Sequence, residues 1–410
     1  MLTEAADRQD PQEPVEFDPF SDTYFDDPYD MYRRLRDEAP VFHSERYGFY
    51  ALSRFDDVSE AHKDWHTFSS THGVDLHTLR RDPAEIASFR SIIMMDPPDH
   101  DRLRALVSRV FTPRAVQSLE PMVREVVDGF ADAIGDATSF DGVADLSAPF
   151  PVEIISRILG VPAADRQQIR HWLDDSLTRE PGNPSPTRKG VEATIASGAY
   201  FYALVQEKRK NPGDDMLSRL TQVEVERDDG TMTGLDDFEI AGFASLLGGA
   251  GAETVTKLVG NAFVLFGRHP GEWQKVVDDP EAIPWAVEEI LRYLPPSQYQ
   301  GRFSLQESTW RGDVLPAGFP VLLLTGAATR DPSAYPDPDR FDVSRKPMQA
   351  LGLGLGIHSC LGAALARMES RVAIEAMVRR WPKFTVDEGA TRRVHMSNVA
   401  GYASVPVHVG

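Results

Sequence analysis

Apolar residues follow a helical period through most of the chain, which places them on one face of successive predicted helices. The pattern is longest between Leu235 and Arg268, where a continuous helix would extend about 50 Å at 1.5 Å per residue. The chain is therefore expected to be mainly α. The predicted helices span residues 101–111, 113–136, 151–159, 163–178, 191–210, 235–268, 284–294 and 361–380.

Strand-like segments are few, short and far apart in the sequence. They are rich in β-branched and aromatic residues, and they lie near 41–42, 49–52, 314 and 321–324. Few strands drawn from distant segments predict an α+β fold in which small peripheral β-sheets accompany a large helical body. The acidic, proline-containing segment 1–19 is expected to be a disordered tail, followed by a single domain over residues 20–410.

Composition narrows the class of protein. Of 410 residues, 41% are apolar, which is enough for a sizeable core, and the formal net charge of −20 opposes nonspecific binding to nucleic acid or to anionic membranes. The sequence contains no run of about 18 apolar residues and so predicts no membrane anchor. Residues 1–19 lack the apolar stretch of a signal peptide, and a single cysteine fits a reducing compartment. A cytoplasmic protein is expected.

The only cysteine, Cys360, lies in a glycine-rich run between Leu353 and Gly362. A single cysteine cannot form an internal disulfide or a multi-thiolate metal site, but it can act as one axial ligand or as a nucleophile. Glycines allow the backbone to approach a flat partner because they carry no Cβ. Apolar residues at helical spacing follow Cys360, so it is expected near a helix N-terminus, where thiolate is favoured over thiol.

This run resembles the haem-ligand loop of the cytochrome P450 family, whose pattern is Phe-Gly-x-Gly-x-His/Arg-x-Cys-x-Gly. Leu353 stands where the family has phenylalanine, a difference that concerns packing near the loop rather than ligation. The resemblance implies that Cys360 is the axial ligand to the iron of haem b and that glycines of the loop contact the cofactor. The matching positions are Gly354, Gly356, His358, Cys360 and Gly362.

Three glycines occur within four residues, from Gly248 to Gly251, in the middle of the long predicted helix. Each costs about 1 kcal/mol relative to alanine, so either close helix packing or a local kink is expected. The segment that follows resembles the family's oxygen-binding signature, Ala/Gly-Gly-x-Asp/Glu-Thr. The resemblance implies that Thr254 donates a hydrogen bond to dioxygen, that Glu253 relays protons, and that Ala250 and Gly251 contact the cofactor.

A charged motif follows the long helix in the order found in the family. Glu289 and Arg292 are three residues apart on one predicted helix, and Arg340 comes later in the chain. An isolated pair of this kind is common and contributes only about 0.2–0.5 kcal/mol on an exposed face. The resemblance implies that these three residues form a charged triad with a structural role.

A second group of motifs is cationic. His100 and Arg104 lie one turn apart in a segment that resembles the family's Asp-Pro-Pro-x-His-x-x-x-Arg helix start. Haem carries two propionates, which need cationic or hydrogen-bonding partners. The resemblance implies that His100, Arg104, Arg302 and His358 bind them.

These matches extend over most of residues 20–410 and imply a haem-thiolate monooxygenase with the cytochrome P450 fold. It would insert one oxygen atom of O2 into a hydrophobic organic substrate, by hydroxylation or epoxidation, with electrons from a separate ferredoxin-type donor, its reductase and NAD(P)H. A haem-thiolate peroxygenase or oxidative-coupling enzyme is the alternative, and a cysteine hydrolase is a more distant one. The candidate substrate-contacting residues are Ile93, Met94, Leu246, Leu247, Gln298, Tyr299 and Val399.

The same resemblance leads to two expectations about the surface. The proline-rich connection from Arg179 to Gly190, together with the segment 72–94, is expected to form a lid over the substrate pocket. Arginines that share helix faces near the cysteine loop favour docking of an acidic electron donor. These arginines are Arg102, Arg109, Arg367 and Arg371.

Overall fold

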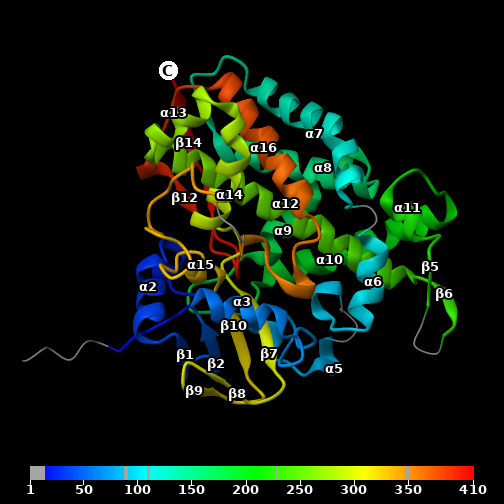
Figure 1. Ribbon diagram of the computed structural model, residues 1–410. Coiled ribbons are helices and arrows are strands. Elements are labelled where there is room, and N and C mark those ends of the chain that lie inside the picture. The colour runs from blue at the N-terminus through cyan, green and yellow to red at the C-terminus, as the bar shows by residue number, and fades with distance from the viewer. Residues whose placement is uncertain (1–13, 87–90, 109–110, 227–229, 347–350) are drawn as a thin grey trace, which may run out of the picture.

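A computed structural model describes residues 14–86, 91–108, 111–226, 230–346 and 351–410. Helices dominate it, and small sheets lie at its periphery (Figure 1). Each predicted helix is present within a few residues of its expected bounds, so the apolar period located the helical body correctly. The helices are α6 (Asp99–Val107), α7 (Pro113–Ile134), α8 (Pro149–Leu159), α9 (Arg166–Leu177), α10 (Arg188–Lys210), α12 (Asp237–Arg268), α14 (Ile283–Tyr293) and α16 (Ala363–Arg380).

Helix α12 crosses the centre of the molecule and packs against α8, α9, α10 and α16 (Figure 1). It begins at a capping box, in which the side chains of Asp236 and Glu239 each accept a hydrogen bond from the other residue's backbone N–H. This arrangement satisfies two N–H groups that the helix itself leaves without partners. Most side chains of α12 are buried, so the helix is a rigid central support for the groups that it carries.

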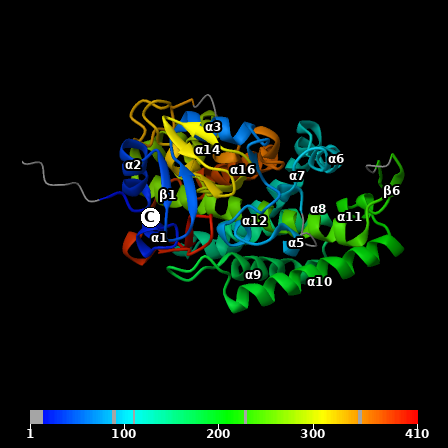
Figure 2. The same cartoon turned by 90° about the horizontal axis from the view of Figure 1, so that it is seen from below.

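Helices α9 and α10 run side by side along one face of the molecule, next to α12 (Figure 2). Their close approach explains the glycines of α12. A Cβ on Gly249 would lie 2.9 Å from Leu173 of α9, and one on Gly248 would lie 3.2 Å from Phe201 of α10. Because α12 is also continuous from its first residue to its last, close packing accounts for the glycine cluster and a break in the helix does not.

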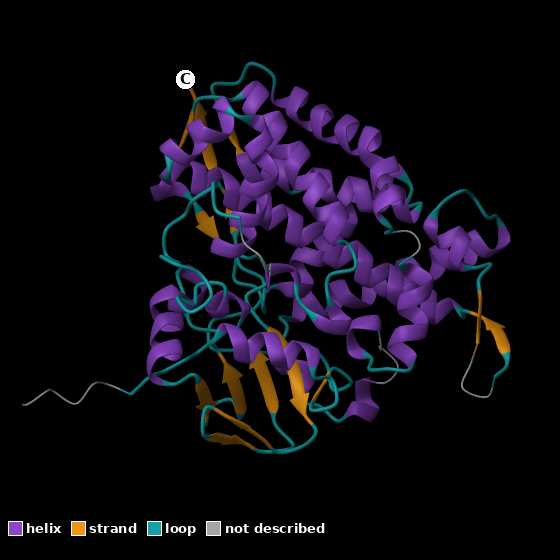
Figure 3. Ribbon diagram, in the orientation of Figure 1, coloured by secondary structure: helices purple, strands orange, loops and turns teal. Residues whose placement is uncertain are grey.

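A five-stranded sheet forms one end of the molecule (Figure 3). Strands β2 and β10 pair in parallel, and the other neighbours are antiparallel. The sequence indicated β1, β2 and β10 but missed β3 and β7, which are recognisable only through their partners. The strand order is β1 (Val41–Ser44), β2 (Phe49–Leu52), β10 (Pro320–Leu323), β7 (Gln300–Ser304) and β3 (Phe68–Ser69).

Smaller sheets complete the periphery. The predicted strand near residue 314 is β9 (Asp313–Leu315), which pairs with β8 (Ser308–Trp310). Near the C-terminus, β14 (Pro406–Val409) lies between β11 (Phe384–Val386) and β4 (Ser139–Asp141). The described chain thus has the predicted fold class, a large helical body with small peripheral sheets.

The N-terminal segment departs from the predicted tail over residues 1–19. Phe17 is 4% exposed, and its ring centroid lies 6.0 Å from those of Tyr24, Phe42 and Phe49. Aromatic packing therefore attaches this part of the segment to the five-stranded sheet. The prediction for residues 1–13 lies outside the described part of the chain.

The connection between α9 and α10 is anchored to the rest of the protein. Arg179 is buried, donates to four backbone carbonyl groups around the connection and lies 3.6 Å from a carboxylate oxygen of Asp75. The Gly182 N–H donates to the Phe20 carbonyl at 2.7 Å. The first expected lid segment is thus held in place by contacts with distant residues. Part of the second, residues 87–90, lies outside the described residues.

Candidate active site

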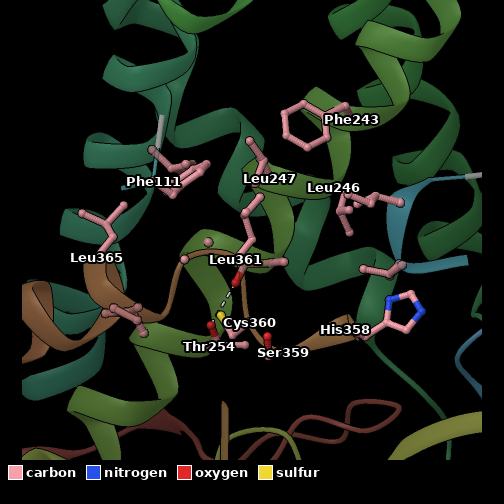
Figure 4. Close-up of a pocket in the computed structure, with 18 of the residues that line it drawn as sticks. Phe111, Phe243, Leu246, Leu247, Thr254, His358, Ser359, Cys360, Leu361 and Leu365 are labelled. Atoms are coloured by element: carbon pink, nitrogen blue, oxygen red, sulfur yellow. Dashed lines mark hydrogen bonds between the residues drawn. The ribbon is translucent and has the colours of Figure 1, made fainter. Parts of the chain in front are cut away.

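Two adjoining cavities, of about 170 and 270 Å³, lie between α12 and the loop that precedes α16. They share so many residues that we treat them as one site. The residues that line both are Ile93, Ala250, Thr254, Val255, His358, Cys360 and Ala366. Figure 4 shows Phe243, Leu246 and Leu247 extending from α12 on the side of the site above the Cys360 loop.

Two glycines in a left-handed conformation shape the loop that carries Cys360. Gly354 has a φ of 71° and Gly356 a φ of 68°, which side chains disfavour. A Cβ on Gly356 would also lie only 2.2 Å from the carbonyl oxygen of His62. The Cys360 N–H donates to the Leu353 carbonyl at 2.8 Å and closes the loop. These constraints fix the position of the sulfur just before α16.

The thiol of Cys360 is open to the site although the residue lies deep within the protein. Burial raises the pKa of Cys360 above its usual value, while the Gly362 N–H and two nearby arginines act in the opposite direction. Burial therefore outweighs the helix N-terminus that was expected to favour thiolate. A metal cation on the sulfur would reverse this balance, because a coordinating thiol is deprotonated.

Small residues leave open space beside the cysteine. A Cβ on Gly362, which lines the site, would meet no atom within 4 Å, and one on Gly354 would meet nothing nearer than 3.6 Å. The facing wall on α12 is equally small, so a flat group fits between that helix and the cysteine loop. The residues of this wall are Ala250, Gly251 and Thr254.

The hydroxyl of Thr254 lines both cavities and donates to the Ala250 carbonyl at 2.8 Å. A threonine hydroxyl has one donor and two acceptor positions, so rotation about its side-chain bond can redirect the proton toward a ligand. Thr254 is therefore placed to exchange a hydrogen bond between its own helix and a group bound in the site.

Glu253 is not among the described residues that line the two cavities, because it lies on a neighbouring face of α12. The residue is 2% exposed, and its Oε1 is 2.7 Å from Nζ of Lys257. Burial raises the pKa of Glu253 to about 7; the charge of Lys257 opposes this shift and that of Asp174 adds to it. A carboxyl group with this pKa can both take and give a proton near neutral pH.

Buried cationic and hydrogen-bonding side chains gather at the larger cavity, which His62, Arg302 and His358 line. Arg302 is 4% exposed and, among the described residues, donates one hydrogen bond, to the Gly301 carbonyl. Both ring nitrogens of His62 and the Nε2 atoms of His358 and His100 are buried without a hydrogen-bond partner in the described part of the chain. Unsatisfied groups in such number favour an anionic ligand.

The pKa values of these buried residues also favour an anionic ligand. Burial and the charge of Arg302 lower the pKa of His62 and that of His358 to about 3. Burial also lowers the pKa of Arg302 to about 10, against the charge of Asp96. Positive charge is thus disfavoured while no counter-ion is present. The carboxylates of a ligand would supply one.

Arg104 contacts the backbone of the cysteine loop rather than the larger cavity. Its Nη2 donates to the Ser359 carbonyl at 2.7 Å, and it lines the smaller cavity only. His100, one turn earlier on α6, lies instead beside His358, with ring centroids 4.6 Å apart. Arg104 therefore supports the backbone of the cysteine loop.

Glu289 and Arg292 form a buried bidentate ion pair, with N–O distances of 2.7 and 2.8 Å. The second arginine at Glu289 is Arg345, whose Nε lies 3.5 Å from Oε2. The side chain of Arg340 is 60% exposed and lies 3.7 Å from Asp342. The assignment of Arg340 to the triad is therefore wrong. An irregular loop decides which arginine turns inward, and no periodic pattern reveals its path.

Part of the predicted substrate pocket lies at the site. Phe243, which the sequence reasoning missed, precedes Leu247 by four residues on one face of α12, so helical spacing could have revealed it. Phe111 comes from the turn before α7 and Ile155 from α8, and no pattern connects them with the motifs. The predicted residues that line the smaller cavity are Ile93, Leu246 and Leu247.

The other predicted substrate contacts lie elsewhere. Gln298 and Tyr299 have no exposed surface, and each donates to a backbone carbonyl. Met94 and Val399 are not among the described residues that line the two cavities. Residues adjacent to the predicted ones in the chain line the larger cavity instead. They are Pro296, Ser297, Gln300 and Asn398.

His62 is a further candidate site residue that sequence reasoning missed. It lies on α3 (Phe55–Lys63), far from every motif in the sequence. Only the fold brings it against Gly356 of the cysteine loop and beside Arg302. A single histidine in an ordinary amphipathic helix carries no signal of this role.

Comparisons with known proteins agree with this geometry. The family model for Cytochrome P450 matches residues 181–401. Erythromycin C-12 hydroxylase of Saccharopolyspora erythraea is 38% identical over 387 residues, which cover 92% of this chain and 93% of that protein. Vitamin D(3) 25-hydroxylase of Pseudonocardia autotrophica is 35% identical over 405 residues and 96% of each chain. The structure of CYP109E1 from Bacillus megaterium in complex with testosterone matches with a TM-score of 0.85 and 31% identity, covering 94% of this chain and 98% of that one.

The thiol of Cys360 faces a wall of small residues and lies beside buried hydrogen-bond donors that have no anionic partner among the described residues. This arrangement fits the shape and charge of haem. The hydroxylases are also similar in sequence to this chain along nearly its whole length. The class is therefore that of haem-dependent monooxygenases. The chain belongs to the cytochrome P450 family. It is an oxidoreductase that uses haem b and O2 and receives electrons from a redox partner. Within the described residues, no helix combines the length and apolar character needed to cross a bilayer.

Proposed function

We propose that Cys360 is the axial ligand of the haem iron and that residues 20–410 act as one haem domain. The observation that carries this proposal is the position of the only cysteine, whose thiol opens onto the site at the end of a constrained loop. When bound, haem supplies the oxidising chemistry, by which one oxygen atom of O2 enters the substrate and the other leaves as water.

The cationic group at the larger cavity binds the two haem propionates. His100, Arg302 and His358 have this role, as the sequence indicated, and His62 joins them. Support comes from their burial without partners and from the lowered pKa values of His62 and His358. Arg104 acts differently, because its bond to the Ser359 carbonyl holds the loop next to the iron ligand. Gly354 and Gly362 leave room for the plane of the cofactor.

Thr254 and Glu253 deliver protons during oxygen reduction. The Thr254 hydroxyl faces the site and donates a hydrogen bond to the oxygen substrate, and Ala250 and Gly251 keep the adjacent wall small. Glu253, whose pKa burial raises to about 7, restores the proton that the hydroxyl has given. Proton delivery of this kind typically contributes about 10²–10⁴ in rate.

The substrate is bulky and largely apolar, and the reaction is hydroxylation. The relatives are named for erythromycin and vitamin D3, and the similar structure holds testosterone. These molecules share large carbon frameworks. The site of this chain offers a comparable surface. Its apolar wall consists of Ile92, Ile93, Phe111, Ile155, Phe243, Leu246 and Leu247.

The electron donor is a ferredoxin that works with its reductase and NAD(P)H in the cytoplasm. The predicted basic docking face is weaker than expected, because carboxylates neutralise much of it. Arg109 lies outside the described residues. Paired charges steer an approaching acidic donor less than free ones do. The ion pairs are Arg102–Asp99, Arg367–Glu288 and Arg371–Glu120.

The carbon monoxide difference spectrum of the reduced protein tests the ligand assignment. Cys360→Ser is expected to lose the thiolate-type spectrum and all monooxygenase turnover, because a hydroxyl is a much poorer electron donor to iron than a thiolate. Ser359→Ala is the matched control, since it alters a neighbouring side chain and keeps the carbonyl that Arg104 binds. An unchanged spectrum in Cys360→Ser would contradict the assignment.

Reconstitution then tests the reaction. Product that appears only with ferredoxin, reductase and NAD(P)H supports the monooxygenase. Equal turnover with peroxide alone, or formation of a coupled dimer of the substrate, would point instead to the peroxygenase or oxidative-coupling alternative. A protein that binds no haem and hydrolyses an ester through Cys360 would overturn the proposal.

A further inference from the structure

A third cavity, of about 340 Å³, opens on a neighbouring face of α12 and shares no lining residue with the two cavities at Cys360. Its walls come from α9, α12 and the segment around β12 (Arg392–Arg393) and β13 (Tyr402–Ser404). Unlike the apolar site, it has several charged groups among its lining residues, so it can hold water. These groups are Arg170, Asp174, Lys257, Arg393 and His395.

The cavity reaches the surroundings of Glu253. Of its lining residues, Lys257 contacts the Glu253 carboxyl group, and the charge of Asp174 acts on that group, while Glu253 itself is not among the lining residues described. Asp174 belongs to α9, and its side chain is 36% exposed. Asp174 therefore lies between solvent and the surroundings of a carboxyl group that is otherwise buried in the protein.

Lys257 has a different role from Asp174. Its Nζ contacts Glu253 Oε1 at 2.7 Å and donates to the Tyr402 carbonyl at 3.3 Å. Its stem is confined, since a Cβ on Gly401 would lie 2.8 Å from the Lys257 Cβ. A lysine held in this way fixes the Glu253 carboxylate and cannot swing to carry a proton. Asp174 is the group that remains able to do so.

Charged and titratable groups gather around Asp174. It faces Arg170, whose Nη1 is 3.7 Å away on the same helix, and Arg393 and His395 line the cavity from the C-terminal segment. Burial raises the pKa of Glu253 to about 7, and the charge of Asp174 adds to this shift. Glu253 can therefore hold and release a proton near neutral pH, next to the helix face that carries Thr254.

We propose that the 340 Å³ cavity is the inlet for protons from solvent and that Asp174 passes them to Glu253, which Lys257 holds in position. This inference rests on the proposed function, in which Glu253 supplies protons to the site. In each passage the Asp174 carboxylate takes a proton that solvent delivers through the cavity as hydronium, which becomes water, and then releases it as the Glu253 carboxylate accepts it. Asp174 is thereby ionised again and takes the next proton, and no electron moves.

Asp174→Asn tests the transfer, with Asp175→Asn as the matched control. Asp175 is the next residue of α9 and pairs at the surface with Lys189, so the control removes the same charge away from the cavity. Asp174→Asn is expected to slow NAD(P)H-dependent product formation at least about tenfold and to enlarge the solvent deuterium isotope effect. Asp175→Asn is expected to change neither. Equal behaviour of the two variants would overturn the proposal.

Infrared titration gives a measurement that needs no turnover. The carboxyl signal of Glu253 is identified as the band absent from Glu253→Gln, and its pKa is followed in Asp174→Asn. The pKa is expected to fall, because the negative charge that raises it is gone. An unchanged Glu253 pKa would show that the two carboxyl groups do not interact and would refute the transfer.

A second variant blocks the cavity without removing a titratable group. Ala403 lines the inlet, so Ala403→Trp fills it while Asp174 and Glu253 remain. Turnover is expected to slow several-fold with a larger solvent isotope effect; wild-type kinetics would overturn the cavity as inlet even if Asp174→Asn failed to fold. If the wild-type protein showed no thiolate-type spectrum, the proposed function would fail, and the infrared titration would still decide whether Asp174 governs Glu253.

Discussion

Two buried charged clusters lie near the cysteine loop, and they differ in how completely their charges are matched. In the first, Glu289 holds Arg292 through two short bonds, and Arg292 also donates to the carbonyls of Thr329 and Pro338. In the second, Arg302 has one bond to a neighbouring carbonyl, and the ring nitrogens of His62 have none among the described residues. The first cluster is complete within the protein, and the second is shaped for a ligand.

Charged residues that are buried to the same extent can therefore have different roles, and their partners distinguish a structural role from a ligand-binding one. A buried ion pair with all its hydrogen bonds made is costly to break and neutral to ligand binding. A buried cation without a counter-ion destabilises the protein by itself and is stabilised only when an anion arrives. Substitutions in the two clusters should therefore have opposite effects on the protein without haem.

The largest expected effect is the loss of Arg292. Arg292→Ala leaves the buried Glu289 carboxylate without its bidentate partner, with the side chain of Arg345 3.5 Å away, and such poorly compensated charges cost about 3–5 kcal/mol. Denaturant unfolding should show this loss with and without haem. Arg219→Ala, at an exposed pair with Asp214, is the control and should stay within about 1 kcal/mol. If Arg292→Ala lowered the free energy of unfolding by less than about 1 kcal/mol, the first cluster would not have a structural role.

Arg302→Ala should behave in the opposite way. Without haem its unfolding free energy should be unchanged or higher, because an unpaired buried cation has been removed. Haem binding should weaken by about 10- to 100-fold, the value of a hydrogen bond to a charged group. Transfer of haem to an apoglobin measures this, and Arg311→Ala, at a surface pair with Asp57, is the control. A stability loss without haem and unaltered haem retention would place Arg302 with the structural cluster.

The same contrast explains what sequence reasoning could find. The helices were located because apolar spacing persists over many residues, as in α12 and α16. Cys360, Thr254 and Glu253 were predicted as site residues because each belongs to a short motif on one loop or helix. Strand β7 and the position of His62 depend on contacts between segments far apart in the chain, which no local pattern records.

Errors arose where the backbone is irregular. Arg340 and Arg345 lie in one loop, and only its turns decide which guanidinium faces Glu289. Gln298 was assigned to the substrate pocket, but its neighbour Ser297 lines the cavity instead. In both places the prediction named a residue of the right chemical type, but the residue that lies at the site is one to five positions away in the sequence. Helices avoid such errors because their period fixes direction.

A pH titration of stability sharpens the comparison further. The pKa of His62 is about 3 in the folded protein, because burial and Arg302 oppose its charge, against roughly 6.5 when unfolded. Below about pH 6.5 the unfolded chain therefore binds a proton that the folded protein does not. The free energy of unfolding therefore decreases as the pH is lowered from about 6.5 to about 3. The loss from pH 7 to pH 5 without haem should be about 2 kcal/mol smaller in His62→Asn than in the wild type.

Haem provides the control for that measurement. Propionates beside His62 would favour its charged form, so the difference between His62→Asn and the wild type should shrink in the haem-bound protein. Urea unfolding of both proteins at pH 7 and pH 5 gives the pH-dependent loss of stability of each protein with haem and without it. Equal pH dependence of the wild type and His62→Asn in the absence of haem would contradict the low pKa and the missing counter-ion.

The smallest expected effect separates the two arginines of the irregular loop. Arg345 is 16% exposed, lies 3.5 Å from Glu289 and donates to the Pro336 carbonyl, so Arg345→Ala should cost about 1 kcal/mol. Arg340→Ala removes a side chain that is 60% exposed and should stay within about 0.5 kcal/mol. A double-mutant cycle with Glu289→Gln should show coupling for Arg345 and none for Arg340. The reverse result would restore Arg340 to the triad, because coupling to Glu289 is what membership of that cluster means.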